Sequence, residues 1–203
     1  MTKKIDLTKI TEYWQNEVAE QVSPWSCVLA ARLVTKALQT LDVPCDILRC
    51  DALALNDEAV FYFSQGVPIA DWSPTAWTVG ANSNPKSEGT HLTVRWEGGG
   101  FDGHLIVVAQ GHIIDLTAPQ FDRPERGIVT GGSLLVPTSK TTRKNAPSGF
   151  GGSHYVEVPI REGKYFISPA RYQNNYKCNG DWEHGYKQFL RGLLHHIRGD
   201  VHV

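Results

Sequence analysis

The stretch HLIVVAQGHIIDLT, residues 104–117, decides the expected fold. Two aliphatic runs flank the dipeptide Gln110-Gly111, and a glycine in a two-residue turn is a strong signal for a β-hairpin. We therefore expect strands over residues 104–110 and 112–117. In this register Ile106 faces Asp115, so His104 and Asp115 lie diagonally on one face with their Cα atoms about 7–8 Å apart.

The rest of this hairpin is apolar on both faces, which predicts that it is buried. A buried carboxylate needs a partner, and His104 is the partner that the register supplies for Asp115. Two interpretations remain open. The pair either serves a nucleophilic site or is a purely structural pair in a sheet, with no cysteine nearby.

Upstream of the hairpin, the apolar spacing predicts an amphipathic helix over residues 24–41. Ser23 can cap this helix, Pro24 suits its first position, and Pro44 follows its end. Cys27 lies near the start of the helix, where backbone N–H groups and the helix dipole favour a thiolate. The alternative is that Cys27 is a small apolar residue on the inner face of the helix.

The remaining elements follow from runs of β-branched and aromatic residues and from helical spacing. We expect strands over 46–53, 60–63, 91–96, 154–160 and 164–167, a short strand over 132–137, and a helix over 181–198. Together these predict one α+β domain over residues 1–203, with an N-terminal cysteine-bearing helix packed on an antiparallel sheet. Residues 80–90 and 123–153 are rich in turn formers, and the second stretch is expected to be a flexible loop.

Composition and charge exclude several classes of function. The 203 residues include 20 basic and 21 acidic side chains, which argues against binding to nucleic acid or to an anionic membrane. We find no apolar segment typical of a signal peptide or of a membrane span, so a cytoplasmic protein is expected, although delivery as an effector stays open. Four cysteines are few for a disulfide framework, and they form no CxxC pair of the kind found in metal sites.

Two segments together resemble the transglutaminase-like and papain-like superfamily of cysteine enzymes. SPWSCVLAARLV, residues 23–34, is similar to the cysteine helix of that superfamily, and DGHLIVVAQGHIIDLTAPQF, residues 102–121, is similar to its histidine-and-aspartate segment. The order Cys, His, Asp along the chain agrees. The ending formed by Asp115, Thr117, Gln120 and Phe121 also resembles the D-x-T…Q-F ending of bacterial papain-fold toxins and effectors.

The resemblance implies a papain-like or transglutaminase-like fold in which Cys27 is the nucleophile, His104 the general base and then acid, and Asp115 the orienting carboxylate. Gln21 stands six residues before the cysteine, where papain-like peptidases carry an oxyanion-hole glutamine, and Trp25 is expected near bound substrate. The implied function is acyl transfer through a Cys27 thioester on a protein or peptide, ending in hydrolysis, deamidation or transglutamination. The implied chemistry needs no cofactor. Two alternatives stay open, a non-catalytic binding module of the same fold and a thioester-dependent N-acyltransferase.

Two other histidines open expected strands and are alternative bases. A two-residue turn at 162–163 would put Arg171 opposite His154, which offers no carboxylate. A Gly-rich turn of uncertain register separates His91 from Asp102. We therefore expect His91 and His154 to be structural or exposed to solvent.

The histidines of the C-terminal helix do not form a metal-binding pattern. His184 and His195 are three helical turns apart, and His195 and His196 point in different directions. We therefore expect no metal site there.

Overall fold

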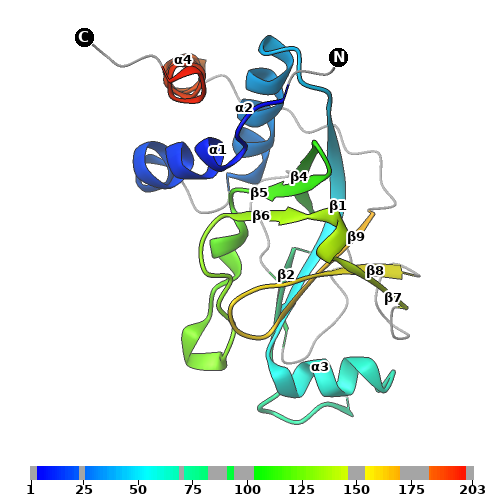
Figure 1. Ribbon diagram of the computed structural model, residues 1–203. Helices are drawn as coiled ribbons and strands as arrows, with labels where there is room; N and C mark the ends of the chain where they lie inside the picture. Colours follow the sequence, from blue (N-terminus) through cyan, green and yellow to red (C-terminus); the bar gives the residue numbers. More distant parts are fainter. Residues whose placement is uncertain are drawn as a thin grey trace.

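The computed structural model describes residues 4–22, 26–68, 71–81, 91–93, 103–145, 154–169 and 183–199. Its helices are α1 (Thr8–Tyr13), α2 (Cys27–Thr40), α3 (Asp57–Ser64) and α4 (Glu183–Arg198), and the π-helix η1 (Trp14–Val18) extends α1. Its strands are β1 (Cys45–Leu55), β2 (Thr78–Ala81), β3 (His91–Thr93), β4 (His104–Ala109), β5 (His112–Asp115), β6 (Leu134–Pro137), β7 (Thr142–Asn145), β8 (His154–Val158) and β9 (Lys164–Pro169). The fold is mixed α+β (Figure 1), as predicted.

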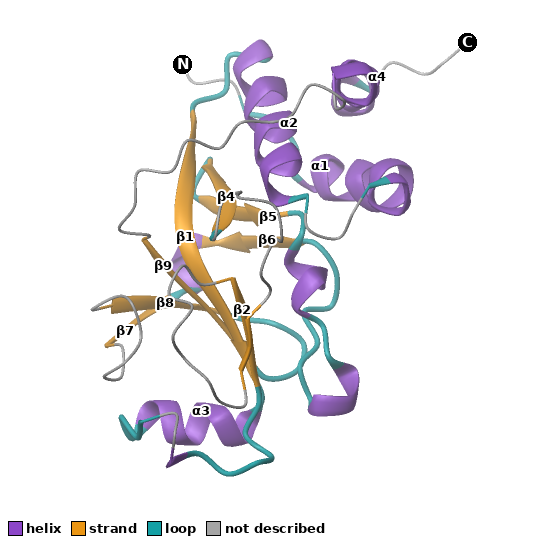
Figure 2. Cartoon of the chain, turned by 180° about the vertical axis from the view of Figure 1, so that it is seen from behind, coloured by secondary structure: helices purple, strands orange, loops and turns teal. Residues whose placement is uncertain are grey.

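A single curled sheet contains all of these strands, in the order β6-β5-β4-β1-β9-β8-β7, with β2 and β3 attached beside β1. Every pair in that order is antiparallel, whereas β2 and β3 run parallel. The long strand β1 runs from α2 at one end of the molecule to α3 at the other (Figure 2). It pairs with β4 through its first half and with β2 and β9 through its second half. Strand β1 therefore joins the β6-β5-β4 part of the sheet to the β9-β8-β7 part.

The hairpin of β4 and β5 has the predicted register. Ala109 faces His112 and Val107 faces Ile114, which leaves Gln110 and Gly111 as the turn. Both turn residues have positive φ, 48° and 72°, as a two-residue type I′ turn requires. Because the turn has two residues, His104 and Asp115 share one face of the hairpin.

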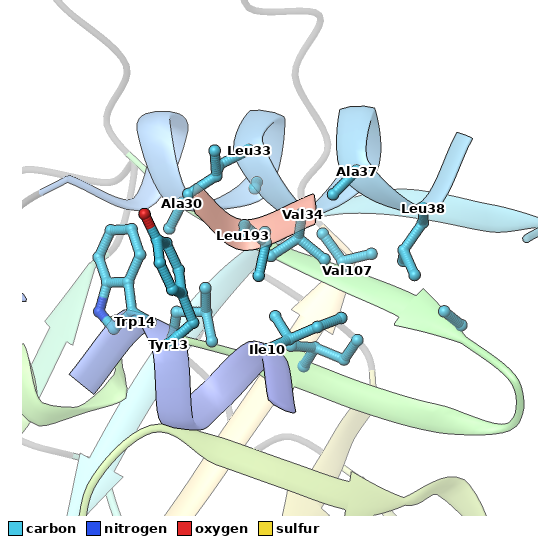
Figure 3. Packing of buried hydrophobic residues seen from close by; sticks show 14 of the residues in the cluster. Ile10, Tyr13, Trp14, Ala30, Leu33, Val34, Ala37, Leu38, Val107 and Leu193 are labelled. Atoms are coloured by element: carbon cyan, nitrogen blue, oxygen red, sulfur yellow. The ribbon is translucent and has the colours of Figure 1, made fainter. Parts of the chain in front are cut away.

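Helix α2 packs on the other face of this hairpin. Its buried residues meet α1, α4 and the inward side chains of β4 in one apolar cluster, which we call the helical core (Figure 3). Its most deeply buried large side chains include Ile10, Leu33, Leu38 and Leu193. Gly192 lets α4 approach α1 closely, because a Cβ atom there would lie 2.1 Å from the hydroxyl oxygen of Tyr13.

The predicted strand over 60–63 is wrong, because these residues belong to α3. Asn56 caps that helix by accepting a hydrogen bond from the backbone N–H of Ala59, at 3.0 Å. Asp57 and Glu58 then lie in the first turn, where the helix dipole favours acidic side chains. The cap and these charges outweigh the β propensity of the aromatic run that follows.

Within the stretch predicted as a loop over 123–153, β6 confirms the short strand expected over 132–137, whereas β7 is a strand where a loop was expected. Asp122 orders the start of this stretch by accepting hydrogen bonds from the backbone and the hydroxyl of Thr130, at 2.6 and 2.7 Å. β6 then pairs with β5, which supplies the hydrogen-bond partners of its backbone. Residues 146–153 lie outside the described part of the chain.

The predicted register around His154 is also wrong. Val158 faces Tyr165 and Val156 faces Ile167, so β8 is shifted by two residues relative to a turn at 162–163. The cause is a β-bridge between Val129 and Glu162, which holds the connection open as a longer loop. Arg171 lies outside the described residues.

Candidate active site

His104 and Asp115 form a hydrogen-bonded pair at the start of β4 and the end of β5. Nε2 of His104 lies 2.8 Å from Oδ2 of Asp115, and neither side chain has any solvent exposure. The two residues therefore meet as the hairpin register predicts. A buried carboxylate is tolerated only with partners, and this histidine is the first of them.

Three further donors satisfy the Asp115 carboxylate. The backbone N–H and the hydroxyl of Thr117 donate to Oδ1, at 3.1 and 3.4 Å. The hydroxyl of Tyr165 on β9 donates to Oδ2 at 2.7 Å, so this oxygen is shared with His104. Both oxygens of the buried carboxylate therefore have hydrogen-bond partners.

Two residues of the 3₁₀-helix η4 (Ala118–Phe121) hold the imidazole from its other sides. The Nε2 amide group of Gln120 lies 3.1 Å from Nδ1 of His104. The Gln120 side chain therefore holds the imidazole at its Nδ1 edge, while Asp115 holds it at Nε2. The Phe121 ring packs edge to face on the imidazole, with 5.3 Å between centroids. We call His104, Asp115, Thr117, Gln120 and Tyr165 the polar cluster.

Cys27 is the first residue of α2 and joins this cluster from the helical side. Its side chain is buried, with 7 % exposed, and it forms a hydrogen bond with His104. Burial lowers the pKa of His104, but the charge of Asp115, the hydrogen bond to it and the interactions with Cys27 raise the pKa to about 10. The structure thus brings Cys27, His104 and Asp115 together.

Cys50 is a second buried thiol beside the same histidine. It pairs with His104 across β1 and β4, and its Sγ donates to the backbone carbonyl of His104 at 3.6 Å. Burial, followed by the nearby charge of Asp115, raises the pKa of Cys50 well above its ordinary value. Cys50 is therefore held as a neutral thiol, so Cys27 is the better candidate for a nucleophile.

The structure does not bring Gln21 to the site. Its side chain is exposed, and its amide donates to the backbone carbonyl of Glu17. The amide therefore satisfies its own helical segment, and the predicted oxyanion role has no support in this geometry. Trp25 lies outside the described residues.

The alternative histidines offer no second site in the described part of the chain. The side chains of His91, His154 and His184 lie outside it. His196 lies 3.7 Å from Glu12 on the surface. Among the described residues no three His, Cys, Asp or Glu side chains gather as metal ligands, and no helix is long and apolar enough to cross a membrane.

Gln120 and Tyr165 are the contacts that sequence reasoning missed. Gln120 belongs to the D-x-T…Q-F ending quoted above. The motif therefore indicated this residue, but it did not indicate that the residue contacts His104. Tyr165 follows Asp115 by 50 residues on a strand two positions from β4, and no local pattern connects them.

Comparison with protein-family models, with curated proteins and with solved structures finds no match. The class that the fold and the site define is therefore a coarse one. The chain is an α+β protein with a curled, mainly antiparallel sheet, and it carries a buried His–Asp pair beside a thiol at a helix N-terminus.

Proposed function

We propose that this protein is a cysteine-dependent acyl-transfer enzyme of the papain-like or transglutaminase-like class. Cys27 is the nucleophile, His104 the general base and then acid, and Asp115 the orienting carboxylate. One observation carries the proposal. The 2.8 Å contact between Nε2 of His104 and Asp115 holds the imidazole beside Cys27, which interacts with the same ring.

The chemistry uses only these side chains and a substrate amide. The Cys27 sulfur attacks the carbonyl carbon while its proton resides on the imidazole of His104. The C–N bond then breaks as His104 returns that proton to the leaving amine or ammonia, which leaves a thioester on Cys27. Water or a second amine attacks the thioester, His104 takes the proton of the attacking group, and the sulfur departs as thiolate. The products are an acid or a new amide.

The electrostatics of the site support this assignment. With a pKa of about 10, His104 carries a proton near neutral pH, which places a positive charge beside the Cys27 side chain. The sulfur also lies in the first turn of α2, where backbone N–H groups lack intrahelical acceptors. Cys27 is the first residue of this helix, so its backbone N–H is one of these groups and is a suitable donor to the oxyanion.

A second candidate is a binding module without catalysis. Cys27 is also a member of the helical core, packed with residues such as Ala30 and Ala31. In that case the thiol is an apolar filler and the His104–Asp115 pair is structural.

The deciding experiment is alkylation by iodoacetamide from pH 5 to pH 9, with the rate at each cysteine measured by peptide mass spectrometry. Cys45 is the internal control, because it is half-buried and burial raises its pKa. We expect Cys27 to react at pH 6 at least about 10-fold faster than Cys45. His104→Gln should abolish this difference while Cys45 is unchanged. A Cys27 no faster than Cys45, or insensitive to His104→Gln, would favour the binding module.

A second measurement separates the transfer reactions. The protein is incubated with p-nitrophenyl acetate, with acetyl-CoA, or with a glutamine-containing peptide, and intact mass reports an acyl group on Cys27. Acylation by p-nitrophenyl acetate and release of ammonia from the peptide support the proposal, with Cys27→Ser as the matched control. Acylation by acetyl-CoA alone would assign an N-acyltransferase instead.

A further inference from the structure

One oxygen of Asp115 accepts two buried donors. His104 Nε2 lies 2.8 Å and the Tyr165 hydroxyl 2.7 Å from the same Oδ2 atom. Tyr165 is fully buried on β9, and its ring lies 5.5 Å from Phe121, which itself packs against His104. A strand remote in sequence thus reaches the group that orients the imidazole.

A second donor on a carboxylate oxygen has two physical effects. It fixes the rotation of the carboxylate, and it lowers the affinity of that oxygen for the imidazole hydrogen. Burial, followed by the charge of Asp115, raises the pKa of Tyr165 well above its ordinary value, so the phenol stays a neutral donor. The other titratable groups beside Asp115 are His104, Cys50 and, through His104, Cys27.

We propose that Tyr165 is a positioning residue. By donating to the Asp115 oxygen that also binds His104, it holds the carboxylate in place and limits how tightly the carboxylate retains the Nε2 hydrogen. In the acyl-enzyme His104 must be free of its extra proton to activate water, so the Tyr165 hydroxyl speeds deacylation. This role rests on the proposed function, although the contact itself can be tested without a substrate.

Tyr165→Phe removes the hydroxyl and keeps the ring against Phe121. Tyr155→Phe is the matched control, because Tyr155 is equally buried on the adjacent strand β8 and packs against Phe63 and Phe166 instead. With histidine labelled in its ring nitrogens, nuclear magnetic resonance reports the Nε2 proton of His104. We expect its resonance to move downfield in Tyr165→Phe, because Asp115 then binds that proton more tightly, and to stay in place in Tyr155→Phe.

Kinetics give the functional readout. With p-nitrophenyl acetate, deacylation at pH 7 should fall about 3- to 10-fold in Tyr165→Phe, which corresponds to a rise of about 0.5–1 in the pKa of His104. The rate should recover at higher pH. A structural role alone would lower the amount of folded protein but leave this pH profile unchanged.

A 3-fluorotyrosine at position 165 keeps the proposal testable if Tyr165→Phe does not fold. Fluorine makes the phenol a stronger donor, so the Nε2 resonance should move upfield, opposite to the shift in Tyr165→Phe. An unmoved resonance in both folded variants, or an equal shift in Tyr155→Phe, overturns the inference. If the wild type never acylates at Cys27, the proposed function fails, and the resonance shifts still decide the role of Tyr165.

Discussion

The two faces of β4 lie in two different kinds of protein interior. Leu105, Val107 and Ala109 project into the helical core, which is apolar throughout. His104, at the start of the same strand, enters the polar cluster, where hydrogen bonds from β5, η4 and β9 converge. Both interiors exclude water, but different forces hold them. The helical core is stabilised by the area and volume it buries, and the polar cluster by the match between donors and acceptors.

The difference predicts different responses to mutation. Loss of an apolar side chain lowers the free energy of unfolding in proportion to the cavity that remains, and it leaves the hydrogen bonds of distant residues unchanged. Loss of one member of the polar cluster leaves its partners buried and unpaired. Asp115 has partners on β4, on β9 and in the turn that follows β5, so its loss is expected to affect the largest number of other residues.

Asp115→Ala should have the largest effect on stability. It leaves the imidazole of His104 and the hydroxyl of Tyr165 buried without their shared acceptor, and removal of one partner of a buried ion pair costs about 3–5 kcal/mol. Urea unfolding followed by circular dichroism measures the loss. Asp115→Asn keeps an oxygen acceptor and should lose less. If Asp115→Ala lowers the free energy of unfolding by less than about 1 kcal/mol, the carboxylate does not stabilise His104 and Tyr165 in the way described.

Leu38→Ala should destabilise the helical core by about 3 kcal/mol, within the usual range of about 2–5 kcal/mol for a buried leucine. Leu38 lies towards the end of α2 remote from Cys27 (Figure 3). In the folded variant we therefore expect the ratio of Cys27 to Cys45 alkylation to be unchanged. Urea unfolding gives the first quantity and peptide mass spectrometry the second. A changed ratio would mean that the two interiors are coupled through α2.

The pH dependence of stability should show a smaller effect that belongs to the polar cluster alone. The pKa of His104 is about 10 in the folded protein and about 6.5 when unfolded, so the folded state holds the extra proton between these values. The stabilisation is complete below pH 6.5 and is lost as the pH rises towards 10. Between pH 6.5 and 8.5 we expect the free energy of unfolding to fall by about 1–2 kcal/mol.

His104→Gln is the control for this slope, because glutamine carries no titrating proton. Burial also raises the pKa of four thiol and phenol groups, those of Cys45, Cys50, Tyr13 and Tyr165. These groups lower the free energy of unfolding only at higher pH, where they ionise in the unfolded chain. Leu38→Ala should lower the whole curve and keep its slope. A curve that is flat in the wild type, or equally steep in His104→Gln, contradicts the assignment.

Where the signal is local, sequence reasoning predicted the structure. The hairpin register follows from Gln110-Gly111, because a turn that requires positive φ restricts the connection to two residues. The cysteine helix follows from an apolar stripe with a stop at its end. The misassigned α3 depends on a single cap at Asn56, which competes with an aromatic run of strong β propensity.

By itself the sequence determined that His104 and Asp115 share one face of a hairpin and that Cys27 lies near the start of an amphipathic helix. These are consequences of turn length and of side-chain periodicity, which act over a few residues. Only the tertiary structure decided that the helix brings the thiol to the imidazole, that Gln120 rather than Gln21 approaches it, and that Tyr165 shares the Asp115 oxygen. Such contacts depend on how separate strands and helices pack. A buried polar group is stabilised by any hydrogen-bond partner of suitable geometry, whatever the distance between the two residues along the chain.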